Sequence, residues 1–261
     1  MKALITGARG TVGSVLCQRI EETGGTAIAW DRAIAAPGDT AAARALVERH
    51  APDAIFHLAL PSQPTGVENE GYLVNEKWTA DMAALAAERG IPFVYASTVM
   101  VFTNDNPGPL TPDVEPDETE GYGYFKLTGE RTARRANPVA RIARLGWQIG
   151  HVRGSNNMID FLEKQFEEHG VIDASTRWMP GTSFLEDTAD SLIAVAGMAP
   201  GTYHIGGNHE WSFYDIVSAL NEIHGNRWTV KPNEDFVCDQ RLLDDRLETG
   251  RLEGRLPLVQ V

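Results

Sequence analysis

Short apolar runs alternate with longer amphipathic segments through the first half of the chain. The apolar runs are too short for helices and cover residues 2–5, 26–30, 54–58, 93–96 and 140–143. Between them, apolar residues recur at helical spacing over residues 11–22, 39–50, 70–89 and 122–136. Because parallel strands need crossover helices, this alternation predicts an α/β fold with a Rossmann-like, doubly wound parallel sheet.

The pattern changes after residue 150. Amphipathic segments then cover residues 156–169, 187–198 and 212–224, with a short strand-like piece at 202–205. We therefore expect residues 1–150 to form the Rossmann-like core and residues 151–261 to form a smaller C-terminal lobe packed on it.

Residues 103–120 lack apolar periodicity and are rich in proline and acidic residues, which predicts an exposed loop of the length that often serves function.

A glycine-rich turn joins the first predicted strand to the first predicted helix, with the sequence Thr6-Gly7-Ala8-Arg9-Gly10-Thr11-Val12-Gly13. Gly7 permits the tight turn, Gly10 lets the backbone approach a pyrophosphate, and Gly13 lets helix and strand pack closely. The N-terminus of the helix also favours a negative charge. The turn therefore predicts a dinucleotide-binding core.

The second predicted strand ends at Asp31, about 20 residues after the turn, where an acid accepts from the adenosine ribose of a bound dinucleotide. A carboxylate at this position repels a 2′-phosphate, so NAD is favoured over NADP. The neighbouring Arg32 is able to neutralise that phosphate, which leaves the use of both cofactors open.

Composition narrows the range of partners. The formal net charge of −13 at pH 7 argues against binding to nucleic acid or to an anionic membrane, because both need a basic surface. The chain has no apolar run long enough to span a membrane and no signal-peptide pattern. Its two cysteines, Cys17 and Cys238, indicate neither a disulfide framework nor a metal motif. These features predict a cytoplasmic protein without a bound metal.

Residues suited to acid–base chemistry follow the fourth predicted strand. Thr98 closes that strand, and Tyr122 and Lys126 are four residues apart on one face of the next predicted helix. A nearby ammonium favours the phenolate form of a tyrosine, and a threonine hydroxyl is able to donate to a carbonyl. The three residues predict a proton donor, its activator and a carbonyl-polarising group. Tyr124 competes for the first role but faces another way, and the pair alone also fits an ordinary surface helix.

With these motifs the chain resembles the extended short-chain dehydrogenase/reductase superfamily, and within it the dTDP-4-dehydrorhamnose reductase branch. The resemblance covers about residues 1–225. It rests on the glycine turn, Pro52-Asp53, Val74-Asn75, residues 95–102, and the Tyr-Gly-x-x-Lys-x-x-Gly-Glu string at residues 122–130, with residues 156–161 and 201–204 as later landmarks.

The resemblance implies an NAD(P)H-dependent reductase of a 4-keto group on a nucleotide-activated deoxysugar. It implies that Tyr122 donates the proton, that Lys126 holds the nicotinamide ribose and that Thr98 contacts the carbonyl. The nucleotide sugar is expected to lie between the two lobes. A homodimer is left open.

The motifs and the resemblance together assign two sets of binding residues. The expected cofactor-binding residues are Gly7, Arg9, Gly10, Thr11, Val12, Gly13, Asp31, Arg32, Asp39, Leu58, Ala59, Leu60, Asn75, Ser97, Tyr122 and Lys126. The expected substrate-binding residues are Thr98, Met100, Asn156, Arg177 and Trp178.

Two other functions stay open at this point. The first is an NAD-dependent epimerase or dehydratase of the same superfamily; a dehydratase usually has acids directly after the threonine, and Val99-Met100 supplies none. The second is a non-catalytic, dinucleotide-binding regulatory subunit, because a protein similar to this branch is the regulatory partner of methionine adenosyltransferase. The intact Thr98, Tyr122 and Lys126 argue against that second function.

Several aromatic residues and histidines have more ordinary interpretations. His57 ends the third predicted strand and is expected to be a packed, hydrogen-bonded histidine. Trp178, Trp211 and Phe213 fit either the core or a stacking surface for a nucleotide base.

Overall fold

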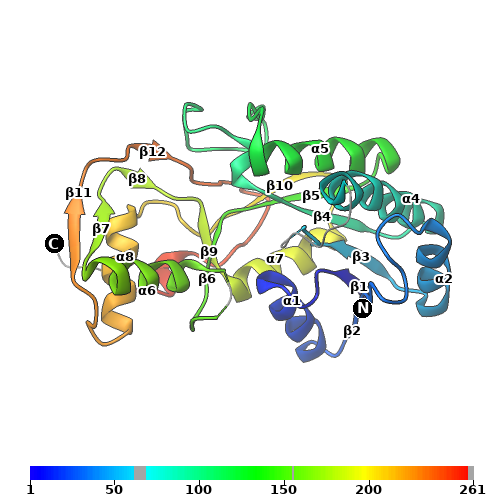
Figure 1. Cartoon of the computed structure of the whole chain (residues 1–261), viewed down its shortest axis with the longest axis horizontal. Coiled ribbons are helices and arrows are strands. Elements are labelled where there is room, and N and C mark those ends of the chain that lie inside the picture. Colours follow the sequence, from blue (N-terminus) through cyan, green and yellow to red (C-terminus); the bar gives the residue numbers. More distant parts are fainter. Residues whose placement is uncertain (62–68, 155, 258–261) are drawn as a thin grey trace.

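A parallel sheet forms the centre of the computed structural model, which describes residues 1–61, 69–154 and 156–257. Six strands follow the order β10-β5-β4-β3-β1-β2, and every neighbouring pair is parallel (Figure 1). They are β1 (Lys2–Thr6), β2 (Thr26–Ala29), β3 (Ala54–His57), β4 (Phe93–Thr98), β5 (Arg141–Leu145) and β10 (Gly201–Ile205). The predicted doubly wound sheet is confirmed. The strand order reverses between β1 and β3, the position where such sheets bind ligands.

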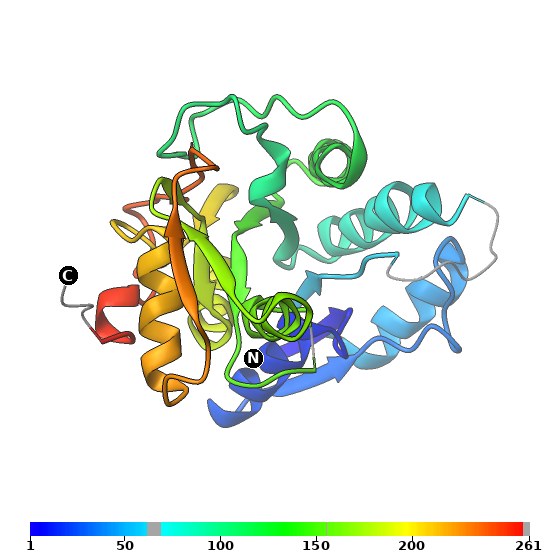
Figure 2. The same ribbon diagram turned by 60° about the vertical axis from the view of Figure 1, so that its left-hand side comes forward.

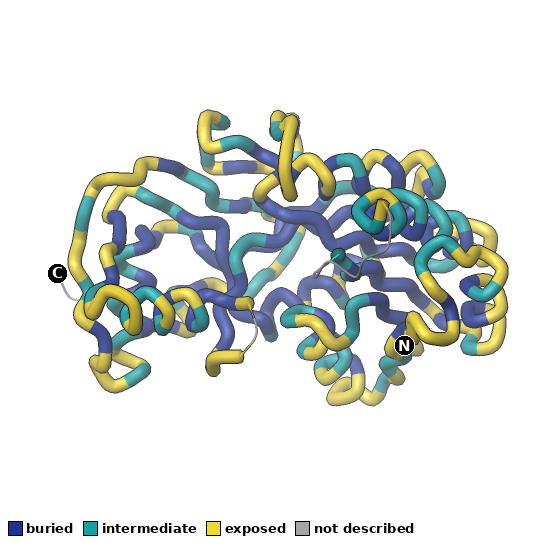
Figure 3. The backbone as a smooth tube through the Cα atoms, in the orientation of Figure 1, coloured by how far each residue is buried: buried dark blue, intermediate teal, exposed yellow. Residues whose placement is uncertain are grey.

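Helices cover both faces of this sheet. The first face packs against α1 (Thr11–Glu22) and α7 (Leu185–Gly197), and the second against α2 (Thr40–His50), α4 (Thr79–Arg89) and α5 (Gly121–Ala136). Side chains alternate along the strands, so that Ile5 packs toward the first face and Leu4 toward the second. Figure 3 shows the resulting buried strands beneath more exposed helices. Burial on both faces explains why the inner strands were recognisable as continuous apolar runs, whereas the edge strand β2 is partly exposed.

The expected helix over residues 70–89 is present in three consecutive parts. A short turn of α3 (Glu70–Tyr72) leads into a π-helical segment, η1 (Leu73–Trp78), and then into α4. This π-helical segment contains Asn75, and π-helical turns are frequent at functional sites.

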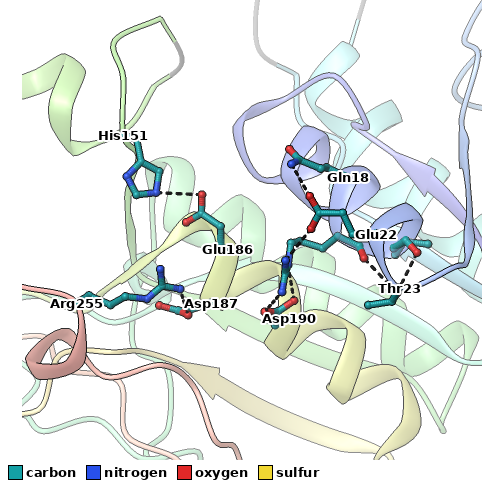
Figure 4. Close-up of polar contacts among 10 residues, drawn as sticks. Gln18, Glu22, Thr23, His151, Glu186, Asp187, Asp190 and Arg255 are labelled. Atoms are coloured by element: carbon teal, nitrogen blue, oxygen red, sulfur yellow. Dashed lines mark hydrogen bonds and ion pairs between the residues drawn. The ribbon is translucent and has the colours of Figure 1, made fainter.

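Residues after 150 complete the core. Strand β10 joins the edge of the sheet beside β5, and α7 packs along α1. At the helix pair, the Arg19 guanidinium donates to both carboxylate oxygens of Asp190 at 2.8 Å and to Glu22 at 2.7 Å (Figure 4). An ion pair therefore links α7, from the second half of the chain, to α1, which follows the glycine turn.

The smaller lobe has its own apolar core. Its helices are α6 (Met158–His169) and α8 (Phe213–Ile223), and each begins at a capping box, formed by Asn157 and by Ser212. Short parallel pairs join β6 (Trp147–Ile149) to β9 (Thr182–Phe184), β7 (Ile172–Ser175) to β11 (Val230–Asn233), and β8 (Trp178–Met179) to β12 (Cys238–Asp239). Figure 2 shows this lobe beside the ends of the core strands.

The chain after β12 runs along the outer edge of β10 and reaches the small lobe again. The Asp244 carboxylate accepts from the backbone N–H of His204 at 3.1 Å, and Arg246 donates to the Thr202 carbonyl at 2.5 Å. These contacts satisfy backbone groups that an exposed edge strand would leave unpaired. The last described turn, η3 (Leu252–Gly254), then contributes Leu252 to the small-lobe core.

Residues 103–120 contain no helix or strand, as predicted for an exposed loop. A short 3-10 turn, η2 (Val99–Val101), links this loop to β4. Leu110 forms a parallel bridge with Leu242, so the loop is tied to the C-terminal segment (Figure 2).

Candidate active site

The glycine turn occupies the carboxyl end of β1, next to the end of β3. Gly7 has φ of +72°, and a β-carbon there would lie 2.9 Å from the Leu58 carbonyl. A β-carbon at Gly13 would overlap the Gly7 carbonyl oxygen. Two of the three glycines are therefore required by close backbone approach, in agreement with the roles expected from the motif.

The N-terminus of α1 is suited to an anion. Gly10 is its cap residue, so no side-chain hydrogen bond caps the first turn. The aligned amides at such an end favour a negatively charged ligand such as a pyrophosphate. The expected residues Arg9, Thr11 and Val12 lie in or beside this turn, and Arg9 is exposed.

The residues expected at the adenosine end lie at the carboxyl ends of β2 and β3. Asp31 accepts from the backbone N–H of Ala33 at 2.8 Å. Arg32 donates to the Leu60 carbonyl at 3.4 Å, so its side chain crosses from the end of β2 to the segment 58–60 after β3. Asp39 caps α2 by accepting from the Ala42 N–H at 2.9 Å.

Helix α5 is pressed against the end of β4. A β-carbon at Gly123 would overlap the Met100 carbonyl oxygen, and one at Gly129 would overlap the Tyr95 hydroxyl. Both glycines belong to the string at residues 122–130. Their contacts hold the α5 face that carries Tyr122 and Lys126 beside the segment that carries Thr98.

The two titratable side chains of this face have opposite exposure. Tyr122 is 42% exposed, and the surroundings of its hydroxyl raise its pKa to about 12, because burial disfavours the phenolate. Lys126 is 2% exposed, with Nζ 4.2 Å from the centroid of the Tyr95 ring. Burial lowers the pKa of Lys126 to about 7, against the opposing effect of the Glu130 carboxylate. Tyr122 is therefore protonated at neutral pH, as a proton donor must be.

Ser97 and Thr98 point to opposite faces of the sheet, as neighbours on a strand do. The Ser97 hydroxyl donates to Glu130 Oε1 at 2.5 Å, on the α5 face. Thr98 is buried, and its Oγ1 accepts from the Met100 N–H at 3.2 Å. The nearby Asn75, in η1, is also buried.

The expected substrate-binding residues divide between the two lobes. Thr98 and the half-exposed Met100 belong to the core, at the end of β4. Asn156, Arg177 and Trp178 belong to the small lobe, where Arg177 forms an exposed ion pair with Glu234 at 3.5 Å. The Trp178 indole N–H donates to Gln240 Oε1 at 2.8 Å, and Gln240 Nε2 donates to Asn104 Oδ1 at 3.0 Å. Through these two hydrogen bonds, Gln240 links Trp178 to the loop at residues 103–120.

The aromatic residues divide between core and surface. Trp211 and Phe213 are 7% and 3% exposed and belong to the small-lobe core. Trp178 is only partly buried; its ring centroid lies 4.7 Å from that of Phe213 and 5.4 Å from that of the exposed Phe236. Of the three candidates for base stacking, only Trp178 therefore has surface to offer.

His57 is a structural residue, as expected. It is fully buried, with Nδ1 2.9 Å from the Thr6 hydroxyl and Nε2 3.1 Å from the Thr79 hydroxyl. Burial lowers the pKa of His57 to about 3, so the ring is neutral at physiological pH. Among the residues that the structure describes, no group of three or more His, Cys, Asp or Glu side chains is arranged to hold a metal ion.

Sequence reasoning missed two sets of contacts near the candidate site. The first is the buried ion pair between Glu130 and Arg144, and the second is the Gln240 bridge to Trp178. The position of Glu130 one turn after Lys126 was visible in the sequence. The partners of Glu130 and Gln240 depend on the tertiary fold, and no local pattern indicates them.

The fold and the site together define a class. A glycine turn at the reversal point of a doubly wound sheet is typical of Rossmann-like dinucleotide-binding proteins. This chain also has a tyrosine–lysine pair on the helix after β4. The family model described as "RmlD substrate binding domain" matches residues 1–236. The chain belongs to this family, which confirms the resemblance found in the sequence.

Known proteins agree with this assignment over most of the chain. A dTDP-4-keto-6-deoxy-D-glucose reductase from Streptomyces niveus is 27% identical over 97% of this chain and 86% of its own length. Methionine adenosyltransferase 2 subunit beta from Xenopus laevis is 27% identical over 84% of this chain and 71% of its own length. The crystal structure of dTDP-4-dehydrorhamnose reductase from Bacillus anthracis in complex with NADP has a TM-score of 0.81 at 19% identity, covering 97% of this chain and 95% of that one.

Within residues 1–61, 69–154 and 156–257, none of the helices is both long and apolar enough to cross a bilayer.

Proposed function

We propose that this protein is an NAD(P)H-dependent reductase of the 4-keto group on a nucleotide-activated deoxysugar. The observation that carries the proposal is the combination of an uncapped glycine turn at the end of β1 with Tyr122 and Lys126 on α5, which is pressed against the end of β4. Family membership and the reductase relative support the substrate class.

The residues present fit a nicotinamide dinucleotide. Gly7 and Gly13 hold the turn at close backbone approach, and the first turn of α1 has no side-chain cap. Close to this turn in the sheet, Ser97 lies at the end of β4 and the segment 58–60 follows β3. Asn75 lies in the π-helical segment η1. The bound dinucleotide supplies the hydride.

Each of the other steps is assigned to a side chain of this protein. Thr98 donates a hydrogen bond to the keto oxygen and polarises it. Tyr122, protonated at neutral pH, gives its proton to that oxygen as negative charge develops. Lys126 binds the nicotinamide ribose and, in its ammonium form, stabilises the phenolate left on Tyr122.

The substrate is proposed to lie between the lobes. Met100 and Thr98 face it from the end of β4, while Asn156, Arg177 and Trp178 face it from the small lobe. The planar Arg177 guanidinium matches the oxygens of a diphosphate, and the partly exposed Trp178 ring offers a face for a base.

NADH is proposed to bind at least as tightly as NADPH. Asp31 lies at the end of β2, where a carboxylate accepts from a ribose 2′-hydroxyl and repels a 2′-phosphate. Arg32, whose guanidinium donates to the Leu60 carbonyl, is the residue able to offset the repulsion between Asp31 and a 2′-phosphate. Fluorescence titration with both cofactors tests this preference, and NADPH binding tighter by about tenfold, or about 1.4 kcal/mol, would contradict it.

The two other functions make different predictions for the purified protein. A recycling epimerase retains its dinucleotide through purification and shows no net consumption of NADH. A regulatory subunit binds the dinucleotide but turns over no sugar, even though Thr98, Tyr122 and Lys126 are intact. Mass spectrometry of the native protein distinguishes retained from exchangeable cofactor.

The decisive experiment measures NADH and NADPH oxidation with a panel of nucleotide-activated 4-keto-6-deoxysugars. We expect stoichiometric conversion of the keto sugar to the alcohol, verified by NMR of the product. Conversion of a sugar to its epimer without net oxidation of cofactor would assign the protein to the epimerases.

A cytoplasmic location is also proposed, on the basis of the two free cysteines and the family's cofactor.

A further inference from the structure

A buried polar network crosses the sheet beside the candidate site. Ser97, Arg144 and His204 stand in register on the neighbouring strands β4, β5 and β10. The Glu130 carboxylate on α5 accepts from Ser97 at 2.5 Å and from two nitrogens of Arg144 at 3.0 and 2.9 Å. Glu130 and Arg144 side chains are only 3% and 5% exposed. The network therefore joins the strand that ends in Thr98 to the helix that carries Lys126.

A contribution to folding stability does not by itself explain why the buried ion pair between Glu130 and Arg144 is present. The cost of removing two charges from water offsets most of their attraction, so a buried ion pair contributes little net stability compared with apolar residues of similar size. The Ser97 hydroxyl and the Arg144 guanidinium both donate to Glu130, which fits an ionised carboxylate, because an ionised carboxylate only accepts. The arrangement thus places one fixed negative charge inside the core at a defined position.

That charge lies one helical turn from Lys126. Residues four apart share a helix face, so the carboxylate and the ammonium lie on the same side of α5. The face of the Tyr95 ring on β4 attracts the Lys126 ammonium at 4.2 Å. The other neighbours carry no charge: the neutral His57 on β3 and the protonated Tyr122 on the same helix. Arg144 on β5 is a cation of the same network, and its ion pair with Glu130 neutralises it.

We propose that Glu130 is a positioning residue for the reaction: it supports the Lys126 ammonium from within α5 and fixes the end of β4 that carries Thr98. This inference rests on the proposed function in that Lys126 acts in its charged form. Burial lowers the pKa of Lys126, and Glu130 is the group that opposes this effect. Arg144 and Ser97 hold the Glu130 carboxylate in place.

The test measures the titration of Lys126 directly and needs no substrate. Protein labelled at lysine Cε is titrated by NMR, and the Lys126 resonance is identified by its loss in Lys126→Arg. In Glu130→Gln we expect the Lys126 midpoint to move to lower pH by about 1 unit, because an opposite charge is removed and Arg144 is left uncompensated. The other lysines serve as internal references: Lys2, Lys77, Lys164 and Lys231.

Two further variants keep the test decisive. Glu130→Gln with Arg144→Met removes both buried charges and so avoids leaving an unpaired buried cation, which destabilises the fold. In this double variant the Lys126 midpoint should also fall, but by less. Glu88→Gln breaks an exposed ion pair with Arg44 by the same substitution and should leave the midpoint unchanged.

Kinetics then connect the network to turnover. The alkaline limb of the kcat–pH profile of Glu130→Gln should move to lower pH together with the Lys126 midpoint, whereas a purely structural role would lower kcat equally at every pH. If wild type reduces no nucleotide sugar, the proposed function fails while the NMR titration still decides the role of Glu130. An unchanged Lys126 midpoint in both Glu130 variants would overturn the inference.

Discussion

Lys126 illustrates how position changes the chemistry of a single residue. An ordinary lysine is charged at neutral pH, but the buried Lys126 has its pKa lowered to about 7. Tyr122, four residues earlier, has its pKa raised to about 12 and keeps its proton. These pKa values fit the proposed role of Tyr122 as proton donor beside a lysine whose charge depends on its surroundings.

Tyr122→Phe should lower kcat by about 10²–10⁴-fold, because it removes the general acid. The dissociation constant for NADH should change little, since the ring remains and only the hydroxyl is lost. Stopped-flow rates and fluorescence titration measure the two quantities. Tyr124→Phe, on the same helix, is the matched control and should retain wild-type rates; the reverse result would move the proton donor to Tyr124.

His57 should make the protein less stable in acid. Its pKa is held at about 3 in the folded protein against 6.5 unfolded, so between these values the unfolded chain binds a proton that the folded chain does not. Stability therefore falls as pH decreases, and between pH 7 and pH 5 this residue contributes a loss of about 2 kcal/mol.

Urea unfolding of His57→Gln at both pH values tests this expectation. The variant should lose less stability on acidification than wild type, whatever its stability at pH 7. His169→Gln removes an exposed histidine and should reproduce the wild-type difference. Equal losses in wild type and His57→Gln would show that the buried ring is not responsible.

At the scale of the element, α5 is the helix that positions the proposed catalytic residues Tyr122 and Lys126. Gly123 and Gly129 let this helix approach the Met100 carbonyl and the Tyr95 hydroxyl more closely than any side chain would allow. Tyr95 is fully buried and has no room to move. The two glycines of the family string are thus explained by packing, while Tyr122 and Lys126 of the same string are the residues proposed to carry the chemistry.

Gly129→Ala should destabilise the protein by about 1–3 kcal/mol through overpacking, although alanine is the better helix former. Chemical denaturation measures the loss. Gly197→Ala is the matched control, because a β-carbon at Gly197 in α7 meets nothing within 4 Å. It should leave stability unchanged or raise it by up to about 1 kcal/mol. Tolerance of Gly129→Ala would mean that α5 is free to shift away from β4.

At the scale of the whole molecule, the negative net charge of the protein opposes the binding of the proposed anionic substrate. The chain has a formal net charge of −13, yet a nucleotide sugar carries a diphosphate. The overall field therefore repels the proposed substrate, and its binding must depend on local donors. In the proposed site, the small lobe supplies such a donor in Arg177.

Arg177→Ala should raise KM for the nucleotide sugar, by about tenfold if a charge-assisted pair is lost, and leave the NADH dissociation constant nearly unchanged. Steady-state kinetics and cofactor titration separate the two effects. Arg44→Ala breaks an exposed ion pair with Glu88 on the core and serves as the control. If Arg177→Ala has wild-type kinetics, Arg153 and Lys231 become the candidates.

Much of the fold was predictable because its signals are local. The strand runs, the helices after them and the glycine turn each depend on residues close together in the sequence. The same holds for Tyr122 and Lys126, whose spacing places them on one face of any helix. The order of the strands, with β10 arriving from residue 201 to extend the edge, was not visible, because it depends on which distant segments pair.

The sequence by itself therefore determined the class of fold, the dinucleotide turn and the catalytic candidates, since periodicity and short motifs encode them directly. Only the tertiary structure decided that Glu130 meets Ser97 and Arg144, that Gln240 joins Trp178 to the loop at 103–120, and that α7 fastens to α1. These contacts join residues far apart in the chain, and burial within the assembled core, not residue type, gives Lys126 and His57 their altered pKa values.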